Sequence, residues 1–318
     1  MKWGVIATGG IAQTVTADML KVPDVEVVAV SSRDLARAQA FADRFGIKRA
    51  YGDYRELLRD ENVEIVYVAT PHAQHHEVTL AALDAGKHVL CEKPIALSSA
   101  QAEEMIVKAS VEKRFLMEAM WTRFNPLIRK VAQAVADGEI GEVRMIRADF
   151  GFQHPFHESD RLWAKEAGGG SVLDLGVYPI ALAHQLLGTP THIAAHGKLA
   201  SSGVDADAGI LLGYENGAHA LLSCSLVANT GSSATIVGTR GRIEIVDPMF
   251  NPTKVIINGV EHVTDDMGYR HQIHEVQIWA STGQVEHSEM SWVATMDIMR
   301  TMEEVLEQLG VSYEDTVR

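Results

Sequence analysis

The sequence contains little cysteine and no long apolar segment. Only Cys91 and Cys224 are cysteines among 318 residues, and they match no metal-ligand spacing. This scarcity excludes a disulfide scaffold, argues against structural zinc and suits a reducing compartment. No apolar run approaches the roughly 18 residues that span a bilayer, and the N-terminal residues do not resemble a signal peptide. We therefore expect a cytoplasmic protein that does not bind membranes.

Basic residues are also few, since 28 Lys and Arg face 42 Asp and Glu for a net charge of −14. Such a field repels phosphate backbones, so a nucleic-acid partner is not expected. The 47% hydrophobic and 22% charged residues are typical of a soluble globular protein. At roughly 150 residues per domain, the length predicts two domains.

The first third of the chain alternates between apolar runs and segments of helical periodicity. This alternation is typical of a doubly wound parallel sheet, the Rossmann architecture, and predicts an α/β domain over residues 1–120. The expected strands lie at residues 3–7, 25–30, 65–69, 88–91 and 115–118, and the expected helices at about 11–20, 35–45, 53–58, 73–85 and 100–113.

From about residue 121 the pattern changes to strand-like runs joined directly by turns. We expect an α+β domain over residues 121–318 with a large mixed or antiparallel sheet. Asn216-Gly217 is a strong hairpin signal within it. A final helix over about 291–309 is a candidate to pack back on the first domain. The expected strands are 143–152, 193–199, 208–214, 218–226, 234–238, 242–246 and 255–257, after a helix near 126–137.

A glycine-rich turn follows the first predicted strand. Such a turn lets backbone N–H groups approach a pyrophosphate at the start of a helix, although glycine turns also simply punctuate α/β folds. The first glycine of the usual fingerprint is replaced by Ala7. The candidate cofactor-binding residues here are Thr8, Gly9, Gly10, Ile11 and Ala12.

The residues after the second predicted strand bear on the choice of cofactor. A carboxylate there would bind the ribose 2′-hydroxyl of NAD, but the sequence reads Ser31-Ser32-Arg33. A hydroxyl followed by a guanidinium suits a 2′-phosphate, so Ser32 and Arg33 favour NADP over NAD. The alternative is a solvated arginine at a helix start.

Two polar segments follow neighbouring parallel strands, at the edge of the sheet where α/β proteins bind ligands. The first is Thr70-Pro71-His72 with His75, and the second is Glu92-Lys93-Pro94. We take Thr70, Pro71, His72, His75, Glu92 and Lys93 as candidate cofactor-binding residues. An exposed helix start is the alternative for the histidines.

These motifs together resemble the glucose-fructose oxidoreductase, inositol dehydrogenase and rhizopine-catabolism (Gfo/Idh/MocA) family of dehydrogenases. The resemblance covers nearly the whole chain. Residues 117–124 are similar to the branch of dimeric dihydrodiol dehydrogenases and NADP-linked aldose dehydrogenases. The resemblance to the family as a whole rests on the following residues: Trp3-Gly4-Val5-Ile6 with the turn, Ser32-Arg33, Thr70-Pro71 with His75, residues 85–94 ending in Glu-Lys-Pro, and Gly168-Gly169-Gly170 with Asp174 and Tyr178.

The resemblance implies hydride transfer without a metal, a cis Lys93–Pro94 peptide, a His75 position near the cofactor, and a homodimer formed through the open sheet of the second domain. His154/His157 and His271/His274 have three-residue spacing, but no HExxH, CxxC or acidic loop accompanies them. We therefore expect no metal site.

Lys93, Asp174 and Tyr178 can supply the chemistry of such a transfer. The hydroxyl proton must be removed, and positive charge must stabilise the developing alkoxide. A nearby lysine lowers the pKa of a tyrosine, and Asp174 lies four residues before Tyr178 on a predicted helix. Most relatives have histidine at the position of Tyr178, so the proton carrier stays open between Tyr178 and Lys93. The alternatives are a surface lysine, a buried core tyrosine and a carboxylate at a helix start.

The sequence therefore predicts an NADP-dependent oxidoreductase acting on a secondary alcohol of a sugar or a cyclic dihydrodiol. Two alternatives remain, an aldose 1-dehydrogenase that forms a lactone and a catalytically silent NADP-binding regulator. Aromatic faces suit such substrates, although each candidate could equally belong to the core. The candidate substrate residues are Trp121, Arg123, Phe150, Phe156 and Trp163.

Overall fold

The structure, a computed structural model, describes residues 1–313, which form two compact units. Unit 1 comprises Met1–Ala96, Ala100–Trp121 and Gly268–Thr295. Unit 2 comprises Leu97–Ser99, Thr122–Met267 and the residues from Met296 onward. Residues 268–295 thus cluster with the N-terminal residues, although they are distant in sequence.

Unit 1 is built on a six-stranded sheet with the order β3-β2-β1-β4-β5-β6, in which every neighbouring pair is parallel. This confirms the predicted Rossmann architecture. The sequence pattern did not predict β3, a strand of three half-buried residues. The strands are β1 (Lys2–Ile6), β2 (Glu26–Ser31), β3 (Arg49–Tyr51), β4 (Ile65–Val68), β5 (His88–Cys91) and β6 (Leu116–Glu118).

The helices that follow these strands lie near their predicted positions. Helix α2 begins at an Asp34 cap and ends at Gly46, which has a φ of +70°. The predicted helix over 73–85 begins as a short 3₁₀ turn, η1 (His72–Gln74). The helices are α1 (Gly10–Met19), α2 (Leu35–Phe45), α3 (Tyr54–Leu58), α4 (His75–Asp84) and α5 (Ser99–Glu112).

A further helix of unit 1, α8 (Arg270–Ser281), was not predicted. It joins the Rossmann sheet through polar contacts: the indole N–H of the fully buried Trp3 donates to Gln277 Oε1 at 3.1 Å. The Tyr269 N–H donates to the Asp18 carboxylate at 2.8 Å. Farther along, the Leu116 N–H of β6 donates to the carbonyl of Val285 at 2.9 Å. The C-terminal third of the chain therefore completes unit 1.

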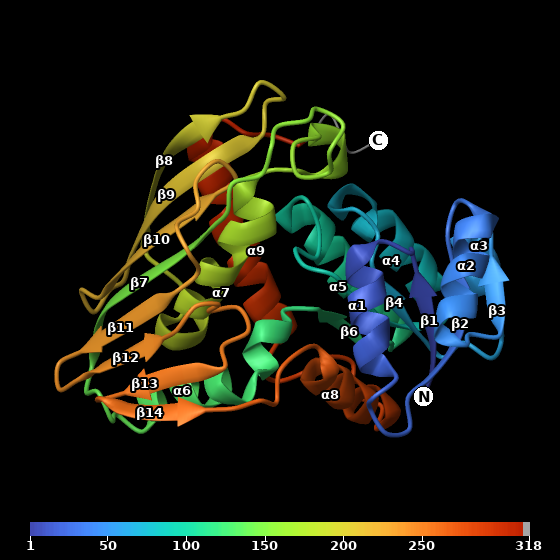
Figure 1. Cartoon of the computed structure of the whole chain (residues 1–318), viewed down its shortest axis with the longest axis horizontal. Coiled ribbons are helices and arrows are strands. Elements are labelled where there is room, and N and C mark those ends of the chain that lie inside the picture. Colours follow the sequence, from blue (N-terminus) through green and yellow to red (C-terminus); the bar gives the residue numbers. More distant parts are fainter. Residues whose placement is uncertain (314–318) are drawn as a thin grey trace. The chain divides into compact units, whose positions relative to one another are not determined.

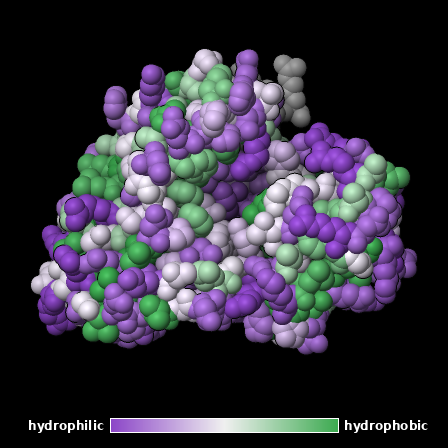
Figure 2. Space-filling model, viewed as in Figure 1, coloured by the Kyte–Doolittle hydropathy of each residue, from purple (hydrophilic) through white to green (hydrophobic). Residues whose placement is uncertain are grey.

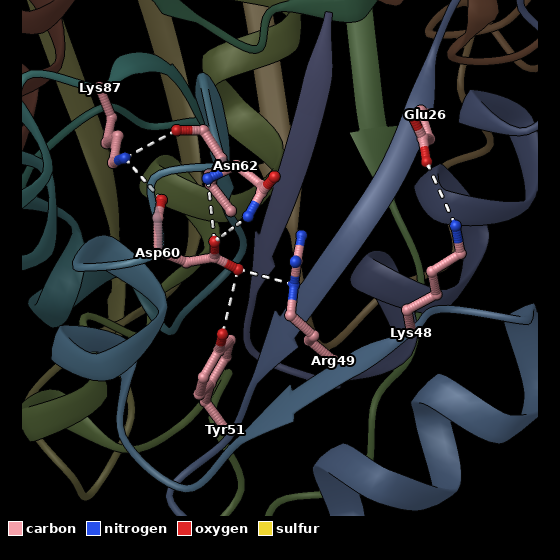
Figure 3. Close-up of polar contacts among 8 residues, drawn as sticks. Glu26, Lys48, Arg49, Tyr51, Asp60, Asn62 and Lys87 are labelled. Carbon is pink, nitrogen blue, oxygen red and sulfur yellow. Dashed lines mark hydrogen bonds and ion pairs between the residues drawn. The ribbon is translucent and has the colours of Figure 1, made fainter.

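A polar network centred on Asp60 ties strand β3 to neighbouring loops of unit 1 (Figure 3). Its carboxylate accepts hydrogen bonds from the Tyr51 hydroxyl at 3.0 Å and from Asn62, and pairs with Arg49 Nε at 2.7 Å. Although burial alone would raise the pKa of Asp60, these contacts lower it. Lys87 donates to the carbonyls of Asp60 and Val63 at 2.9 and 2.7 Å. Lys87 of the Ala-Gly-Lys-His-Val block thus has a structural role.

Unit 2 contains an eight-stranded sheet with the order β14-β13-β12-β11-β7-β10-β9-β8. The sheet is mixed, because β7 and β10 are parallel whereas the other neighbouring pairs are antiparallel. The predicted hairpin at Asn216-Gly217 joins β9 to β10, and Gly217 has a φ of +78°. The strands are β7 (Val143–Gly151), β8 (His192–Leu199), β9 (Asp205–Gly213), β10 (His219–Ser225), β11 (Ala234–Gly238), β12 (Arg242–Ile245), β13 (Lys254–Ile257) and β14 (Val260–Val263).

Helices α6 (Pro126–Ala136), α7 (Val177–Leu187) and α9 (Trp292–Leu309) lie on one face of this sheet (Figure 1). Helix α9 is the predicted closing helix, and its residues from Met296 belong to unit 2. Strand β14 was not predicted, because three of its four residues are exposed and carry no burial pattern. The α+β class predicted for this part of the chain is confirmed.

Hydrophilic residues surround small hydrophobic patches on the face shown in Figure 2. Within residues 1–313, none of the helices combines the length and apolar character that a bilayer span requires.

Candidate functional site

The glycine-rich turn begins at a residue in the left-handed region. Ala7 has a φ of +89°, and its N–H donates to the Ser31 carbonyl at 3.0 Å. This is the position where the usual fingerprint has its first glycine, which adopts such a φ without strain. The turn therefore keeps the glycine-like backbone despite the alanine, at a conformational cost that such sites often carry.

The next residues leave open space at the start of α1. A Cβ built on Gly9 or Gly10 would meet no atom within 4 Å. Gly9 is the N-cap of the helix, and no side-chain hydrogen bond caps it. Open space beside uncapped N–H groups and the positive end of a helix dipole fits the pyrophosphate of a dinucleotide.

Arg33 and Asp34 follow β2 and have different roles. Arg33 is exposed, whereas the Asp34 carboxylate accepts hydrogen bonds from the N–H groups of Ala36 at 2.8 Å and Arg37 at 3.3 Å as the cap of α2. Ser32 Oγ accepts the Asp34 N–H at 3.4 Å. The first carboxylate after β2 is therefore used by the helix, and Arg33 is left exposed.

His75 links the two polar segments that follow β4 and β5. The ring is fully buried, with Nδ1 at 2.8 Å from the Pro94 carbonyl and Nε2 at 2.9 Å from the Thr70 carbonyl. The His72 ring, also buried, lies edge-on at 5.6 Å between centroids. The alternative of an exposed helix start therefore does not hold for either histidine. His75 therefore links the backbone of Thr70 to that of Pro94, the residue after Lys93.

Acid should destabilise the protein, because two buried histidines are held neutral. Burial lowers the pKa of His75 to about 4 despite its two carbonyl neighbours, and burial with the Arg123 charge lowers that of His184 to about 4. The unfolded chain takes up these protons near pH ~6.5. The free energy of unfolding is thus intact above that pH and falls toward pH ~4, by roughly 2 kcal/mol per histidine at pH ~5.

Urea unfolding at neutral and mildly acidic pH measures this loss. The His184→Gln variant should show a smaller difference between the two conditions, because one titrating group is gone. The same difference in both proteins would contradict the assignment to His184.

The segment around Lys93 is anchored on both sides. The Tyr67 hydroxyl donates to the buried Glu92 carboxylate, and burial together with that carboxylate raises the pKa of Tyr67. The Ile95 N–H donates to Glu118 Oε1 at 3.1 Å. The intervening Lys93–Pro94 peptide is cis, as expected, and the Lys93 side chain is half-buried. The segment at Lys93 is thus held through the Glu92 carboxylate before it and through the contact of Ile95, two residues after it, with the buried Glu118 carboxylate.

In unit 2, Asp174 and Tyr178 lie at the buried start of a continuous helical segment. Residues Val172–Gly176 form a π-helical turn, η4, that runs directly into α7. Pro179 lies directly after the π-helical turn, at the third residue of α7. Asp174 and Tyr178 are 7% and 8% exposed. Short π-helical turns are rare and occur frequently at functional sites.

Arg161 pairs with Asp174, with 3.0 Å between Nη1 and Oδ1. Sequence reasoning did not identify Arg161, which lies 13 residues before its partner. The segment between them contains a further 3₁₀ turn, η3 (Lys165–Ala167), and the glycine triplet. Because neither residue spacing nor composition signals this contact, only the fold shows it.

Two phenylalanines pack against the Tyr178 ring. Phe150 of β7 lies at 5.5 Å between ring centroids, and Phe250 lies at 5.8 Å. The two phenylalanines stack on each other at 4.7 Å. Phe150 was a predicted substrate residue, whereas Phe250 was missed because it lies in a loop after β12 without regular periodicity.

The other predicted substrate residues have different surroundings. In unit 1, Trp121 stacks on Tyr269 at 4.1 Å between centroids. In unit 2, buried Arg123 donates to the Ala181 carbonyl at 3.4 Å. Trp163 is 1% exposed and donates to a backbone carbonyl, so it forms the core of its own loop. Phe156, 45% exposed, packs against Trp163.

Among the described residues, one group has the composition of a metal site: Glu275, His287 and Glu289 in unit 1. The Glu289 N–H donates to His287 Nδ1 at 3.1 Å, so the proton of a neutral ring lies on Nε2, which faces Glu275 at 3.4 Å. A metal ion at Nε2 would require the opposite tautomer. The hydrogen bonds therefore favour a structural role for this group.

The chain matches two family models and several relatives. The model described as "Oxidoreductase family, NAD-binding Rossmann fold" matches residues 1–120, and the "GFO/IDH/MocA C-terminal domain" matches residues 128–244. A trans-1,2-dihydrobenzene-1,2-diol dehydrogenase from Xenopus laevis is 38% identical over 98% of this chain and 99% of its own length. One from Mus musculus is 40% identical over 81% of this chain and 78% of its own.

A solved structure extends the similarity to three dimensions. A 3-ketoreductase from Actinomadura kijaniata in complex with NADP and TDP-benzene aligns with a TM-score of 0.85 at 27% identity. The alignment covers 97% of this chain and 98% of that one. From these matches and from its two sheets, the chain belongs to the Gfo/Idh/MocA family of oxidoreductases.

Proposed function

We propose that the protein is an NADP-dependent dehydrogenase that oxidises a secondary alcohol of a cyclic trans-diol or a sugar, or reduces the corresponding carbonyl. The observation that carries this proposal is the Tyr178 ring, held at the start of α7 against Phe150 and Phe250. An acid/base hydroxyl beside aromatic faces suits a ring-shaped diol. The names of the relatives, dihydrodiol dehydrogenases and a ketoreductase, support the same substrate class.

The residues of unit 1 fit the proposed cofactor. The open turn at Gly9 and Gly10 would hold the pyrophosphate, and Arg33 would hold the 2′-phosphate. When bound, NADP supplies the hydride acceptor. The solved 3-ketoreductase complex contains the same cofactor, which supports NADP over NAD.

The chain's own residues would move the proton. We propose that Tyr178 exchanges the hydroxyl proton, while the Lys93 ammonium stabilises the developing alkoxide. Asp174 would orient the reacting groups, and its pairing with Arg161 fixes its own carboxylate. In this assignment Lys93 acts electrostatically and Tyr178 carries the proton.

A spectrophotometric screen tests the function directly. Reduction of NADP and NAD would be followed at 340 nm with trans-cyclohexanediols, dihydrodiols, inositols and aldoses, and oxidation of NADPH with the matching ketones. We expect NADP-dependent turnover of a diol or sugar. Lactone formation from an aldose would favour the aldose 1-dehydrogenase alternative. Tight NADP binding without turnover of any of these compounds would overturn the proposal in favour of a regulator.

Replacing Arg33 with alanine should weaken NADP binding selectively. Arg33 is exposed two residues after β2 and would contribute a charge-assisted contact to the 2′-phosphate, which NAD lacks. We expect the Kd for NADP to rise roughly 10- to 100-fold and that for NAD to change less than about twofold. Calorimetric titration with both cofactors measures the ratio. The exposed Arg37→Ala variant of α2 is the matched control, and equal losses for both cofactors would refute the 2′-phosphate role.

We also propose a homodimer formed through the open face of the unit 2 sheet. Ala220 and Leu222 of β10 are buried on the helix side, whereas Leu221 between them is 44% exposed on the opposite face. Packing this leucine against a second copy would remove its apolar surface from water. Sedimentation equilibrium should show a dimer that the Leu221→Lys variant dissociates. A wild-type monomer at micromolar concentration would contradict the interface.

A further inference from the structure

Asp205 is a buried carboxylate of unit 2 for which the proposed chemistry has no use. It is the first residue of β9 and is 0% exposed. Its Oδ2 accepts a hydrogen bond from the Ser171 hydroxyl at 2.6 Å and another from the Val172 N–H at 2.6 Å. Both donors belong to the start of η4, so a residue 33 positions away in sequence binds the beginning of this helical segment.

Ser171 occupies the N-cap position of η4 but does not cap it. A serine there usually accepts a backbone N–H of its own helix, whereas this side chain makes no capping hydrogen bond. Instead, its hydroxyl donates to Asp205 and lies 3.4 Å from Cys224 Sγ. Asp205 therefore provides the acceptor that the N-cap residue does not.

The glycine triplet before Ser171 is enclosed from two sides. Gly170 has a φ of +115°, and a Cβ there would lie 2.4 Å from Asp205 Oδ1 and 3.0 Å from the Tyr313 hydroxyl oxygen. Tyr313 donates to the Gly169 carbonyl. On the other side, the Gly170 N–H donates to the Leu162 carbonyl at 2.9 Å, and a Cβ on Gly169 would lie 2.6 Å from that same oxygen.

The contacts around the glycine triplet also determine where Asp174 and Tyr178 lie. Asp174 and Tyr178 lie three and seven residues after Ser171 on one uninterrupted helical segment. The same segment packs closely on β10, because a Cβ on Gly176 would lie 3.1 Å from Cys224 Sγ. A shift of the first helical turn would therefore move both functional side chains relative to the sheet.

We propose that Asp205 is a positioning residue, which caps η4 from β9 and thereby fixes Asp174 and Tyr178 for the reaction. The proposal rests on the proposed function. A buried carboxylate is costly unless it is well hydrogen-bonded, so a neutral or apolar residue would be the simpler choice for stability alone. Here both donors belong to the segment that carries the functional residues.

The experiment compares Asp205→Ala and Asp205→Asn with Tyr178→Phe and the double variant Asp205→Ala/Tyr178→Phe. Asparagine keeps an oxygen that can accept both hydrogen bonds, so it should retain most of the activity. Alanine should lower kcat by at least about tenfold, with the Kd for NADP changed less than about twofold. If Asp205 acts through Tyr178, the double variant should be no slower than Tyr178→Phe.

Hydrogen exchange gives a readout that does not depend on turnover. In Asp205→Ala, amides of residues 172–178 should exchange at least about tenfold faster, whereas those of β1 and β4 in unit 1 should be unchanged. If Asp205→Ala does not fold, Ser171→Ala, which removes one donor, replaces it with a smaller expected loss. Unchanged exchange, or losses in kcat that add to those of Tyr178→Phe, would overturn the proposal. Faster exchange in a protein without any turnover would support the cap while refuting the dehydrogenase.

Discussion

Replacing Lys93 with methionine should lower kcat by roughly 10³-fold, one of the two largest effects that we expect from a single substitution. Methionine keeps most of the apolar stem and removes only the ammonium, so the loss reports the positive charge next to the developing alkoxide. The segment itself should stay in place, because Glu92 and Ile95 are held by Tyr67 and Glu118. Steady-state kinetics with the substrate from the screen measures the effect.

Two further variants make this result specific. Lys93→Arg should not restore activity, because a planar guanidinium cannot replace a compact ammonium at a fitted site. Lys48→Met removes a lysine whose side chain is 81% exposed in the same unit, and it should leave kcat unchanged. Near-normal turnover of Lys93→Met would show that the Lys93 ammonium does not take part in the reaction. Lys93 would then be a surface lysine beside a turn.

Replacing Tyr178 with phenylalanine should lower kcat by roughly 10²- to 10⁴-fold, the range of a lost general acid/base. The ring contacts with Phe150 and Phe250 remain, so the fold around the site should be preserved. Tyr214→Phe is a matched control, because this tyrosine of unit 2 is also 8% exposed and burial raises the pKa of its hydroxyl. The control should turn over normally.

The pH profile of the variants separates the two candidate proton carriers. If Tyr178 accepts the proton, the ionisation that limits alcohol oxidation at low pH should disappear from the residual activity of Tyr178→Phe. If that ionisation persists in Tyr178→Phe and is lost in Lys93→Met, Lys93 carries the proton and the tyrosine only binds the substrate.

The sequence pattern predicted those strands and helices whose own residues carry a clear apolar periodicity. Apolar runs such as Ile65–Val68, which is buried throughout, are typical of central parallel strands, so the Rossmann sheet could be predicted. The three-residue β3 and the exposed β14 are stabilised by their neighbours in the sheet, and their own residues gave no signal. The helix α8 was also missed, although Ile273, Val276 and Ala280 are buried at helical spacing.

For the candidate site, motifs identified single residues but not their contacts. The pairing of Arg161 with Asp174, the packing of Phe250 on Tyr178 and the cap from Asp205 join positions that are 13 to 72 residues apart, and no periodicity encodes such contacts. His75 was placed near the cofactor by resemblance. The structure gives it a carbonyl at each ring nitrogen, a contact that only the fold reveals.

The division of unit 1 into separate stretches of chain has a consequence for its biosynthesis. A ribosome that has made the first 121 residues has produced every strand of the Rossmann sheet, but not the partners of Trp3, Asp18 and Leu116. Those partners emerge about 150 residues later. Domains generally fold as units during synthesis, starting from the N-terminus. In this protein, unit 1 cannot complete its fold until residues 268–295 have been made, after most of unit 2 has been translated.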